Sequence, residues 1–209
     1  MGGVWRMIRW LSRAFVVPLL NVRVRGAGLV PRGGALILSN HQSFADPILV
    51  GVGLDRQVGY MARDSLFRVP GIAWVMRRCG VIAVRRDAAT SLREPIRRLQ
   101  TGRLVCLYPE GTRTPDGCVH DVKPGFVAIA RRAGVPIVFC GIAGAFEAWP
   151  RTHVLPRTGR VRVVFGELMT AAEVAEWSAK GREAEFAAEA GRRLTTLATE
   201  AYDWRRPRA

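Results

Sequence analysis

Short apolar runs alternate with helical patterns along most of this chain, and this alternation limits the folds that it can adopt. The runs that read as buried strands are GALILSN (34–40), VGYMA (58–62), GVIAVRR (80–86), RLVCLYP (103–109), VPIVFCGI (135–142) and RVRVVFGE (160–167). Helical patterns cover 47–54, 66–78, 88–100, 125–133 and 171–201, the last of them broken near Gly181. Strands that alternate with helices predict an α/β domain with a mostly parallel mixed sheet flanked by helices.

The first twenty residues, MGGVWRMIRWLSRAFVVPLL, follow a different pattern. The arginines Arg6, Arg9 and Arg13 recur at steps of three and four residues. The apolar residues Trp5, Ile8, Leu11 and Phe15 recur at similar steps on another side. This pattern predicts an amphipathic helix in residues 1–24 that contacts a membrane interface, followed by the α/β domain in 25–209. The alternative is a helix that packs on its own domain.

No uninterrupted apolar stretch reaches the roughly 18 residues that a spanning helix needs. We also see no signal peptide with a small-residue cleavage site. We therefore expect a monotopic protein rather than one that crosses the membrane.

The chain is strongly basic, with 32 Lys+Arg against 17 Asp+Glu and a net charge of +15. Such an excess predicts attraction to polyanions, such as nucleic acid, an anionic membrane surface or phosphorylated substrates. A nucleic-acid-binding protein is one alternative, but its aromatic residues would alternate with arginines as a stacking platform requires. The aromatic residues here do not, so we expect no nucleic-acid partner.

The four cysteines are Cys79, Cys106, Cys118 and Cys140. No two of them form a C-x-x-C pair, and three lie in or beside apolar runs. We expect buried free thiols, and neither a disulfide framework nor a metal site.

The stretch SNHQSFADP (39–47) follows an apolar run and contains His41, one of three histidines in the chain. A histidine suits general-base chemistry near neutral pH because its unperturbed pKa is about 6.5. Asp46 can orient the imidazole and stabilise its charged form if the chain between them curls back. Since there is no G-x-S-x-G motif, we expect the pair to activate a hydroxyl of the substrate. The alternative is a histidine and an aspartate N-cap without a joint role, with Pro47 opening the helix.

A second polar stretch, PEGTRTPDG (109–117), comes at the end of another predicted strand. Gly111 permits a tight turn, and Arg113 can bind a phosphate through two hydrogen bonds. Arg85 and Arg86, at the end of the strand 80–86, offer a second anion contact. The alternative is a surface turn with a Glu110–Arg113 pair and a solvated strand end. A base and two arginine sites together describe a pocket for a phosphorylated alcohol.

Four stretches resemble the sequence blocks of the glycerophosphate and lysophosphatidic acid acyltransferase family, in the family's order. NHQSFADP resembles its N-H-x-x-x-x-D block, GVIAVRR its G-x-I-x-V-x-R block, YPEGTRT its F-P-E-G-T-R-S block and GVPIVFCGI its V-P-I-x-P-V block. VKPGF (122–126) also matches the lysine-containing stretch that usually follows the glutamate block. The resemblance extends over about 25–170 of the sequence.

The resemblance implies a role for each matching position. His41 resembles the general base, and Asp46 resembles its orienting partner. The positions implied in binding the phosphate of the acceptor are Arg86, Glu110, Gly111, Thr112, Arg113 and Lys123. It further implies an α/β domain with the site in a cleft and N-terminal helices on the membrane.

The resemblance also implies the reaction and its partners. A fatty acyl group passes from acyl-CoA or acyl carrier protein, the co-substrate, directly to the hydroxyl of lysophosphatidic acid, giving phosphatidic acid. No further cofactor, metal or acyl-enzyme is expected. Because this lysophospholipid acceptor lies in a membrane and the thioester donors are cytosolic, we expect a location on the cytoplasmic face of the cell membrane.

Three positions depart from the family's pattern. Arg85 stands where Asp or Asn is common, Phe139 replaces the second proline of the fourth block, and Asp64 stands where many relatives carry a basic residue. These changes leave His41 and Asp46 intact but leave the headgroup of the acceptor open. The same chemistry on another lysolipid or an amino-lipid is the alternative within enzymes, and a non-catalytic membrane-binding protein is the alternative outside them.

Overall fold

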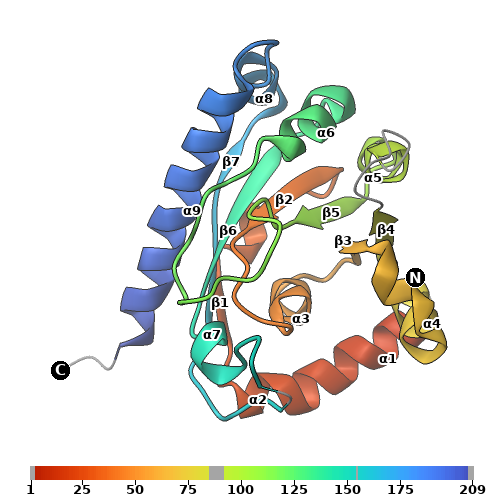
Figure 1. Ribbon diagram of the computed structural model, residues 1–209, viewed down its shortest axis with the longest axis vertical. Coiled ribbons are helices and arrows are strands. Elements are labelled where there is room, and N and C mark those ends of the chain that lie inside the picture. The colour runs from red at the N-terminus through yellow and green to blue at the C-terminus, as the bar shows by residue number, and fades with distance from the viewer. Residues whose placement is uncertain (1–2, 85–91, 154, 207–209) are drawn as a thin grey trace.

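The computed structural model describes residues 3–84, 92–153 and 155–206, and among them a single mixed sheet organises the fold (Figure 1). Its strands lie in the order β1-β7-β6-β2-β5-β3-β4. Their bounds are β1 Arg23–Arg25, β2 Ala35–Ser39, β3 Val58–Arg63, β4 Ile82–Val84, β5 Leu104–Leu107, β6 Ile137–Ala143 and β7 Arg162–Met169. Every neighbouring pair is parallel except β6 and β7. The predicted mostly parallel mixed sheet is therefore confirmed.

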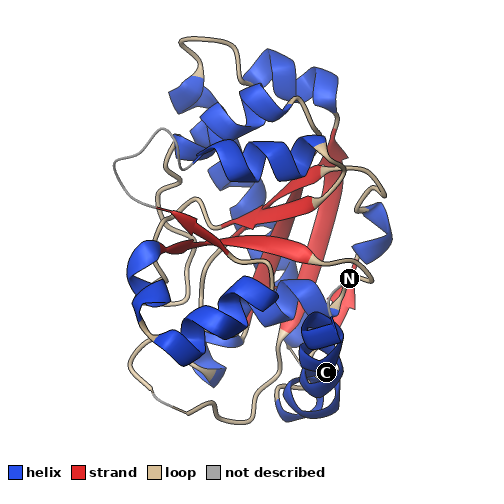
Figure 2. Cartoon of the chain, turned by 90° about the vertical axis from the view of Figure 1, so that its right-hand side faces the viewer, coloured by secondary structure: helices blue, strands red, loops and turns tan. Residues whose placement is uncertain are grey.

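Helices cover both faces of this sheet, which Figure 2 shows as a twisted layer between them. On one face α3 (Asp46–Val52) packs with α2 (Val17–Leu19) and α7 (Ala145–Ala148). On the other face lie α5 (Arg93–Gln100), α6 (Gly125–Ala133), α8 (Ala171–Trp177) and α9 (Glu183–Arg205). The remaining helices are α1 (Gly3–Leu11), a π-helical turn at Ser12–Val16, α4 (Pro70–Arg78) and 3₁₀ turns at Ala27–Leu29 and Asp64–Arg68.

Strand β2 is the centre of the core, and it explains where the polar loops meet. All five of its residues are buried, with Ile37 facing one core cluster and Leu36 and Leu38 facing the other. Its neighbours β5 and β6 both run parallel to it, on opposite sides. In an open α/β sheet, a central strand with parallel neighbours on both sides brings the loops at the carboxyl ends of these strands together. The loops after β2, β5 and β6 are therefore expected neighbours.

The N-terminal helix forms as the sequence predicts, but its arginines do not all face outward. Arg9 Nη2 donates to the carbonyl oxygen of Leu54 at 2.7 Å, and Arg13 Nη2 donates to that of Val52 at 3.1 Å. Arg13 is exposed as the predicted arginine edge requires, whereas Arg9 is partly buried. The two bonds tie Arg9 of α1 and Arg13 of the π-helical turn to the end of α3 and the residues just after it.

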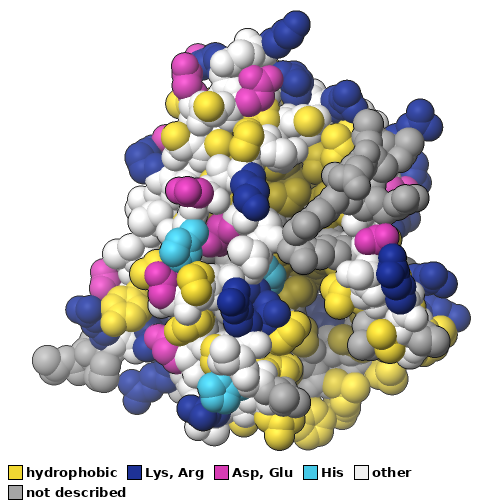
Figure 3. Space-filling view, viewed as in Figure 1, with side chains coloured by type: hydrophobic (Ala, Val, Ile, Leu, Met, Phe, Trp, Pro, Cys, Tyr) yellow, Lys and Arg dark blue, Asp and Glu magenta, His cyan; other side chains and the backbone are white. Residues whose placement is uncertain are grey.

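An apolar stripe on the N-terminal segment is exposed. Its members are Met7, Trp10, Leu11, Phe15 and Leu19. Trp10 and Phe15 are each 65% exposed, whereas Trp5 and Ile8 are partly buried. In the space-filling view, apolar side chains gather along the lower edge of the molecule, where α1 and α2 lie (Figure 3). No helix in the described ranges is long and apolar enough to cross a membrane.

Several local predictions differ from the structure. Asp46 is not the N-cap of α3, because Ala45 holds that position and Asp46 is the first helical residue. The helix predicted over 88–100 begins at Arg93 in the described part of the chain, since 85–91 lie outside it. Strand β1 and helix α7 were not predicted. Among the cysteines, Cys106 and Cys140 are buried as expected, whereas Cys118 is exposed.

Candidate active site

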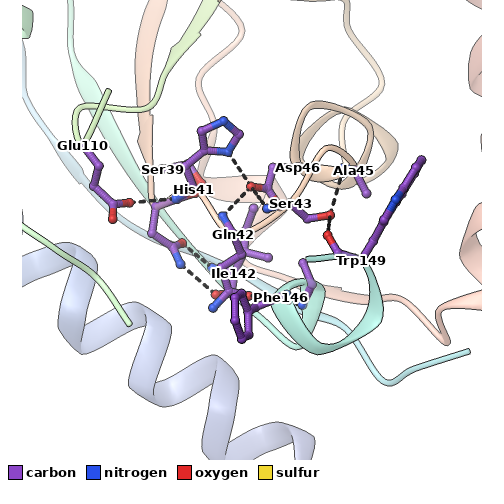
Figure 4. Close-up of polar contacts among 12 residues, drawn as sticks. Ser39, His41, Gln42, Ser43, Ala45, Asp46, Glu110, Ile142, Phe146 and Trp149 are labelled. Atoms are coloured by element: carbon purple, nitrogen blue, oxygen red, sulfur yellow. Dashed lines mark hydrogen bonds and ion pairs between the residues drawn. The ribbon is translucent and has the colours of Figure 1, made fainter. Parts of the chain in front are cut away.

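The loop between β2 and α3 curls back on itself and brings Asp46 to His41 (Figure 4). Asp46 Oδ2 lies 2.7 Å from His41 Nδ1 and accepts the backbone N–H groups of Gln42 at 2.6 Å and Ser43 at 2.8 Å. An oxygen that accepts these N–H bonds carries no proton itself, so the proton of the His41 contact lies on Nδ1. This leaves Nε2 of His41 as the acceptor nitrogen, which is the form that a general base needs.

The imidazole of His41 is held on its face as well as at its edge. The ring stacks on Tyr108, with centroids 4.2 Å apart and planes 18° from parallel. Tyr108 directly follows β5, and burial raises the pKa of its hydroxyl well above the ordinary value. The ring of Tyr108 therefore stays neutral. Since the side chain of His41 is 21% exposed and Asp46 is fully buried, the pair opens to solvent only through the imidazole.

Buried polar side chains fix this loop to elements far away in sequence. Asn40 pairs with Ile142 of β6 as a strand residue would: its Nδ2 donates to the carbonyl oxygen at 2.9 Å and its Oδ1 accepts the N–H at 2.7 Å. Gln42 Nε2 donates to the carbonyl oxygen of Gly117 at 2.7 Å, and Ser43 Oγ donates to that of Trp149 at 2.8 Å. In the sequence, these residues carry no signal of their own beyond their place beside His41.

Glu110 connects the two polar loops. Its Oε1 accepts the backbone N–H of His41 at 2.8 Å, and its Oε2 accepts that of His120 at 3.1 Å. The side chain is buried, and burial raises the pKa of its carboxyl above the ordinary value although both backbone bonds oppose this. In this structure Glu110 holds His41 in place, while its predicted contact with the acceptor stays a prediction.

Gly111 and Lys123 lie together beside the same loop. Gly111 has a φ of +74°, a conformation that favours glycine, and a Cβ added there would lie 3.4 Å from Lys123 Nζ. The backbone N–H of Lys123 donates to the carbonyl oxygen of Pro109 at 3.0 Å. Thr112 is exposed at the tip of the turn. The ammonium group of Lys123 therefore lies over the glycine turn, as a contact for an anion would.

Arg113 packs against the loop of His41 rather than projecting into solvent. Its guanidinium carbon lies 3.5 Å from the centre of the Phe44 ring, and Nη1 is buried without a hydrogen-bond partner. Burial lowers the pKa of Arg113, and the charge of Asp46 acts in the opposite direction. The structure thus brings a cation to the loop of His41 and Asp46. The remaining predicted residue, Arg86, lies outside the described residues.

A family model described as Acyltransferase matches residues 21–143, which is more than half of the chain. The chain belongs to the acyltransferase family. The matched segment contains both polar loops, so the resemblance expected from the sequence blocks is confirmed.

Two curated relatives and one solved structure carry consistent descriptions. The 1-acyl-sn-glycerol-3-phosphate acyltransferase LPAT1 of Arabidopsis thaliana chloroplasts is 29% identical over 162 residues, covering 74% of this chain and 45% of that protein. The 1-acyl-sn-glycerol-3-phosphate acyltransferase of Bacillus subtilis is 29% identical over 167 residues, covering 78% of this chain and 81% of that protein. This acyltransferase thus spans about half the length of its plant relative.

The similarity in three dimensions covers almost the whole chain. The crystal structure of the 1-acyl-sn-glycerophosphate (LPA) acyltransferase PlsC from Thermotoga maritima aligns with a TM-score of 0.79 and 25% sequence identity. The alignment covers 98% of this chain and 81% of that one. It therefore includes the N-terminal helices as well as the sheet.

Proposed function

We propose that this acyltransferase moves a fatty acyl group from a thioester donor to the free hydroxyl of lysophosphatidic acid, giving phosphatidic acid. The observation that carries the proposal is the 2.7 Å contact between His41 Nδ1 and the buried Oδ2 of Asp46. It leaves Nε2 to accept a proton, and the loop of Arg113 lies beside it. The activities named for the Arabidopsis, Bacillus and Thermotoga proteins support the same reaction.

The reaction follows from the position of the imidazole. Nε2 of His41 takes the proton of the acceptor hydroxyl while that oxygen attacks the thioester carbonyl carbon. The negative charge of Asp46 stabilises the imidazolium that forms. As the new C–O bond forms and the C–S bond breaks, the proton on Nε2 passes to the leaving sulfur. The products are an ester and a free thiol, so no acyl-enzyme is needed.

The basic residues near His41 would hold the phosphate of the acceptor. Arg113 offers a planar set of donors, and Lys123 offers a compact ammonium over the turn at Gly111. We place Thr112 and Arg86 in the same site on the resemblance alone. Glu110, whose two oxygens accept backbone N–H groups, would act by holding these loops together.

The location of the acceptor requires a peripheral contact with a membrane. We place the exposed stripe of Met7, Trp10, Leu11, Phe15 and Leu19 in the acyl-chain boundary of an anionic bilayer. The donor would be acyl-CoA or acyl carrier protein, both soluble in the cytosol. The proposed location is therefore the cytoplasmic face of the cell membrane.

A transfer assay tests the proposal directly. Purified protein is mixed with vesicles that contain one acceptor, either lysophosphatidic acid, lysophosphatidylcholine or an amino-lipid, and with either acyl-CoA or acyl carrier protein as donor. We expect turnover with lysophosphatidic acid, and a loss of at least about 100-fold in His41→Ala at an unchanged melting temperature.

Two results would overturn parts of the proposal. Turnover with another acceptor alone would keep the chemistry and refute the assigned headgroup. A turnover rate in His41→Ala equal to that of the wild-type protein would refute the role of the histidine.

A further inference from the structure

The ring of Phe44 lies under the guanidinium group of Arg113. We propose that Phe44 is a positioning residue, which holds this guanidinium ready for the phosphate of the acceptor without neutralising its charge. The inference rests on the proposed function, because it concerns the site where a phosphorylated acceptor would bind.

The contact is close, and it joins the two polar loops. The guanidinium carbon of Arg113 lies 3.5 Å from the centre of the Phe44 ring, which is well within the range of a cation–π interaction. Phe44 comes from the loop of His41 and Asp46, whereas Arg113 comes from the loop after β5. The phosphate contact and the general base are thereby held by the same short segment.

The position of Phe44 is fixed from several sides although its side chain is 53% exposed. The preceding residue, Ser43, donates its backbone N–H to Asp46 Oδ2 at 2.8 Å and its hydroxyl to the carbonyl oxygen of Trp149 at 2.8 Å. The ring itself lies against the indole of Trp149, with centroids 6.0 Å apart. The platform under Arg113 is therefore anchored by the catalytic loop and by Trp149.

Several arginines also lie over aromatic rings, at 4.1–5.5 Å from the ring centre, and some of these are held by carboxylates as well. Glu94 binds Arg97 and Arg98 on α5, and Glu189 binds Arg192 and Arg193 on α9. These carboxylates fix the guanidinium groups but also compensate their charge.

Among the residues that the structure describes, Arg113 forms no ion pair within 4.0 Å of a carboxylate, although the charge of Asp46 acts on it from further away. Its Nη1 is buried and has no hydrogen-bond partner. An aromatic ring orients a cation through its quadrupole without compensating its positive charge or using its N–H donors. This arrangement suits the bidentate binding of a dianionic phosphate. A carboxylate at the position of Phe44 would repel the same phosphate.

The test compares substitutions of Phe44 that keep or remove the aromatic face. Phe44→Leu keeps the apolar bulk and removes the ring, so the KM for lysophosphatidic acid should rise about three- to tenfold. The KM for the donor and kcat should stay within about twofold. Phe44→Tyr and Phe44→Trp keep the aromatic face and should restore the KM for the acceptor. The matched control is Tyr202→Leu, which removes an exposed ring that contacts Arg205 at the end of α9 and Arg206 just after it.

A double-mutant cycle separates positioning from direct contact with the acceptor. In an Arg113→Gln background, Phe44→Leu should have no further effect on the KM, because the group that it positions is gone. Additive effects of the two substitutions would overturn the proposal and assign Phe44 a contact of its own with the lipid. An unchanged KM in Phe44→Leu would overturn it as well.

A measurement without turnover keeps this result separate from the fate of the proposed function. The NMR signal of the Arg113 Nε–H should be displaced by the ring current of Phe44 and should return in Phe44→Leu. Titration with glycerol 3-phosphate should then give a dissociation constant about three- to tenfold higher in Phe44→Leu than in the wild-type protein. If the wild-type protein acylates no lysolipid, the proposed function fails and this titration still decides the role of Phe44. Equal dissociation constants in the two proteins would refute that role.

Discussion

Arg9 donates a hydrogen bond to the carbonyl oxygen of Leu54 at 2.7 Å, and this bond ties the N-terminal helix to the segment that follows α3. Burial lowers the pKa of Arg9, and the neighbouring charge of Arg13 lowers it further. Since α3 begins at Asp46, the helix proposed to lie on the membrane packs against the same short helix that orients His41. Arg9 is therefore part of the protein's own packing.

Arg9→Gln should destabilise the fold, because it removes a charge-assisted hydrogen bond from a partly buried carbonyl group. We expect the free energy of unfolding to fall by about 1.5–3 kcal/mol, measured by urea denaturation. The matched control is Arg6→Gln, which removes the same charge from an exposed position of the same helix and should have little effect. Equal losses in both variants would contradict the structural role of Arg9.

The exposed apolar stripe should carry the part of membrane binding that salt does not remove. Changing Trp10 and Phe15 together to Ser should make most of the binding to anionic vesicles salt-labile, because only the electrostatic part remains. The measurement is co-sedimentation with vesicles at rising salt concentration. Tyr202→Ser, which removes an exposed ring from α9, serves as the control. Binding of the double variant that resists salt as well as the wild type would place the contact elsewhere.

The sequence predicts those parts of the fold that depend on local patterns. Strand β2 is predictable because its five consecutive residues are small or apolar, and all five are buried in the structure. Helix α6 has the predicted bounds, 125–133, because its apolar spacing and the following Gly134 mark them. The His41–Asp46 contact is local as well, since only five positions separate the two residues.

Features that depend on distant partners were not predictable in this way. Strand β1 reads RVR and has no strand pattern of its own, yet it pairs with β7 in the register Arg23↔Arg162. Arg9 turns toward the protein because its guanidinium binds the carbonyl oxygen of Leu54. The helical spacing of the arginines gives no information about this distant partner. Asp46 looked like an N-cap beside Pro47, but the backbone N–H groups of its own loop compete for its carboxylate.

The loop beyond Glu110 contains a second histidine–aspartate contact, whose strength should depend on pH. His120 Nε2 lies 2.8 Å from Asp116 Oδ1 on the surface, and this hydrogen bond raises the pKa of His120 above 6.5. The pKa of Asp116 is lowered to about 2, first by the backbone N–H of Cys118 and then by His120.

The sign of the pH effect follows from these two shifts. The contribution of His120 to stability is complete below pH 6.5 and disappears as the pH rises through its raised pKa. The contribution of Asp116 is present above its ordinary pKa of 3.8 and is lost as the pH falls through about 2. Asp116→Asn should therefore lower the pKa of His120 toward 6.5 in an NMR titration. The pKa should not move in the control Asp203→Asn on α9, and an unmoved pKa in Asp116→Asn would contradict the assigned cause.

Asp46→Asn separates the role of the carboxylate in positioning the loop from its electrostatic role. The amide oxygen of asparagine can still accept the N–H groups that now bind Oδ2, so the loop should keep its shape. The negative charge that stabilises the imidazolium of His41 is lost, and the new amide N–H₂ would lie where Oδ1 is buried without a partner. We expect kcat to fall by about 10²–10⁴, less than in His41→Ala, while the KM for the acceptor changes little. Steady-state kinetics check this result, with Asp203→Asn as the exposed control on α9. A kcat close to that of the wild type would show that the charge of Asp46 takes no part in the transfer.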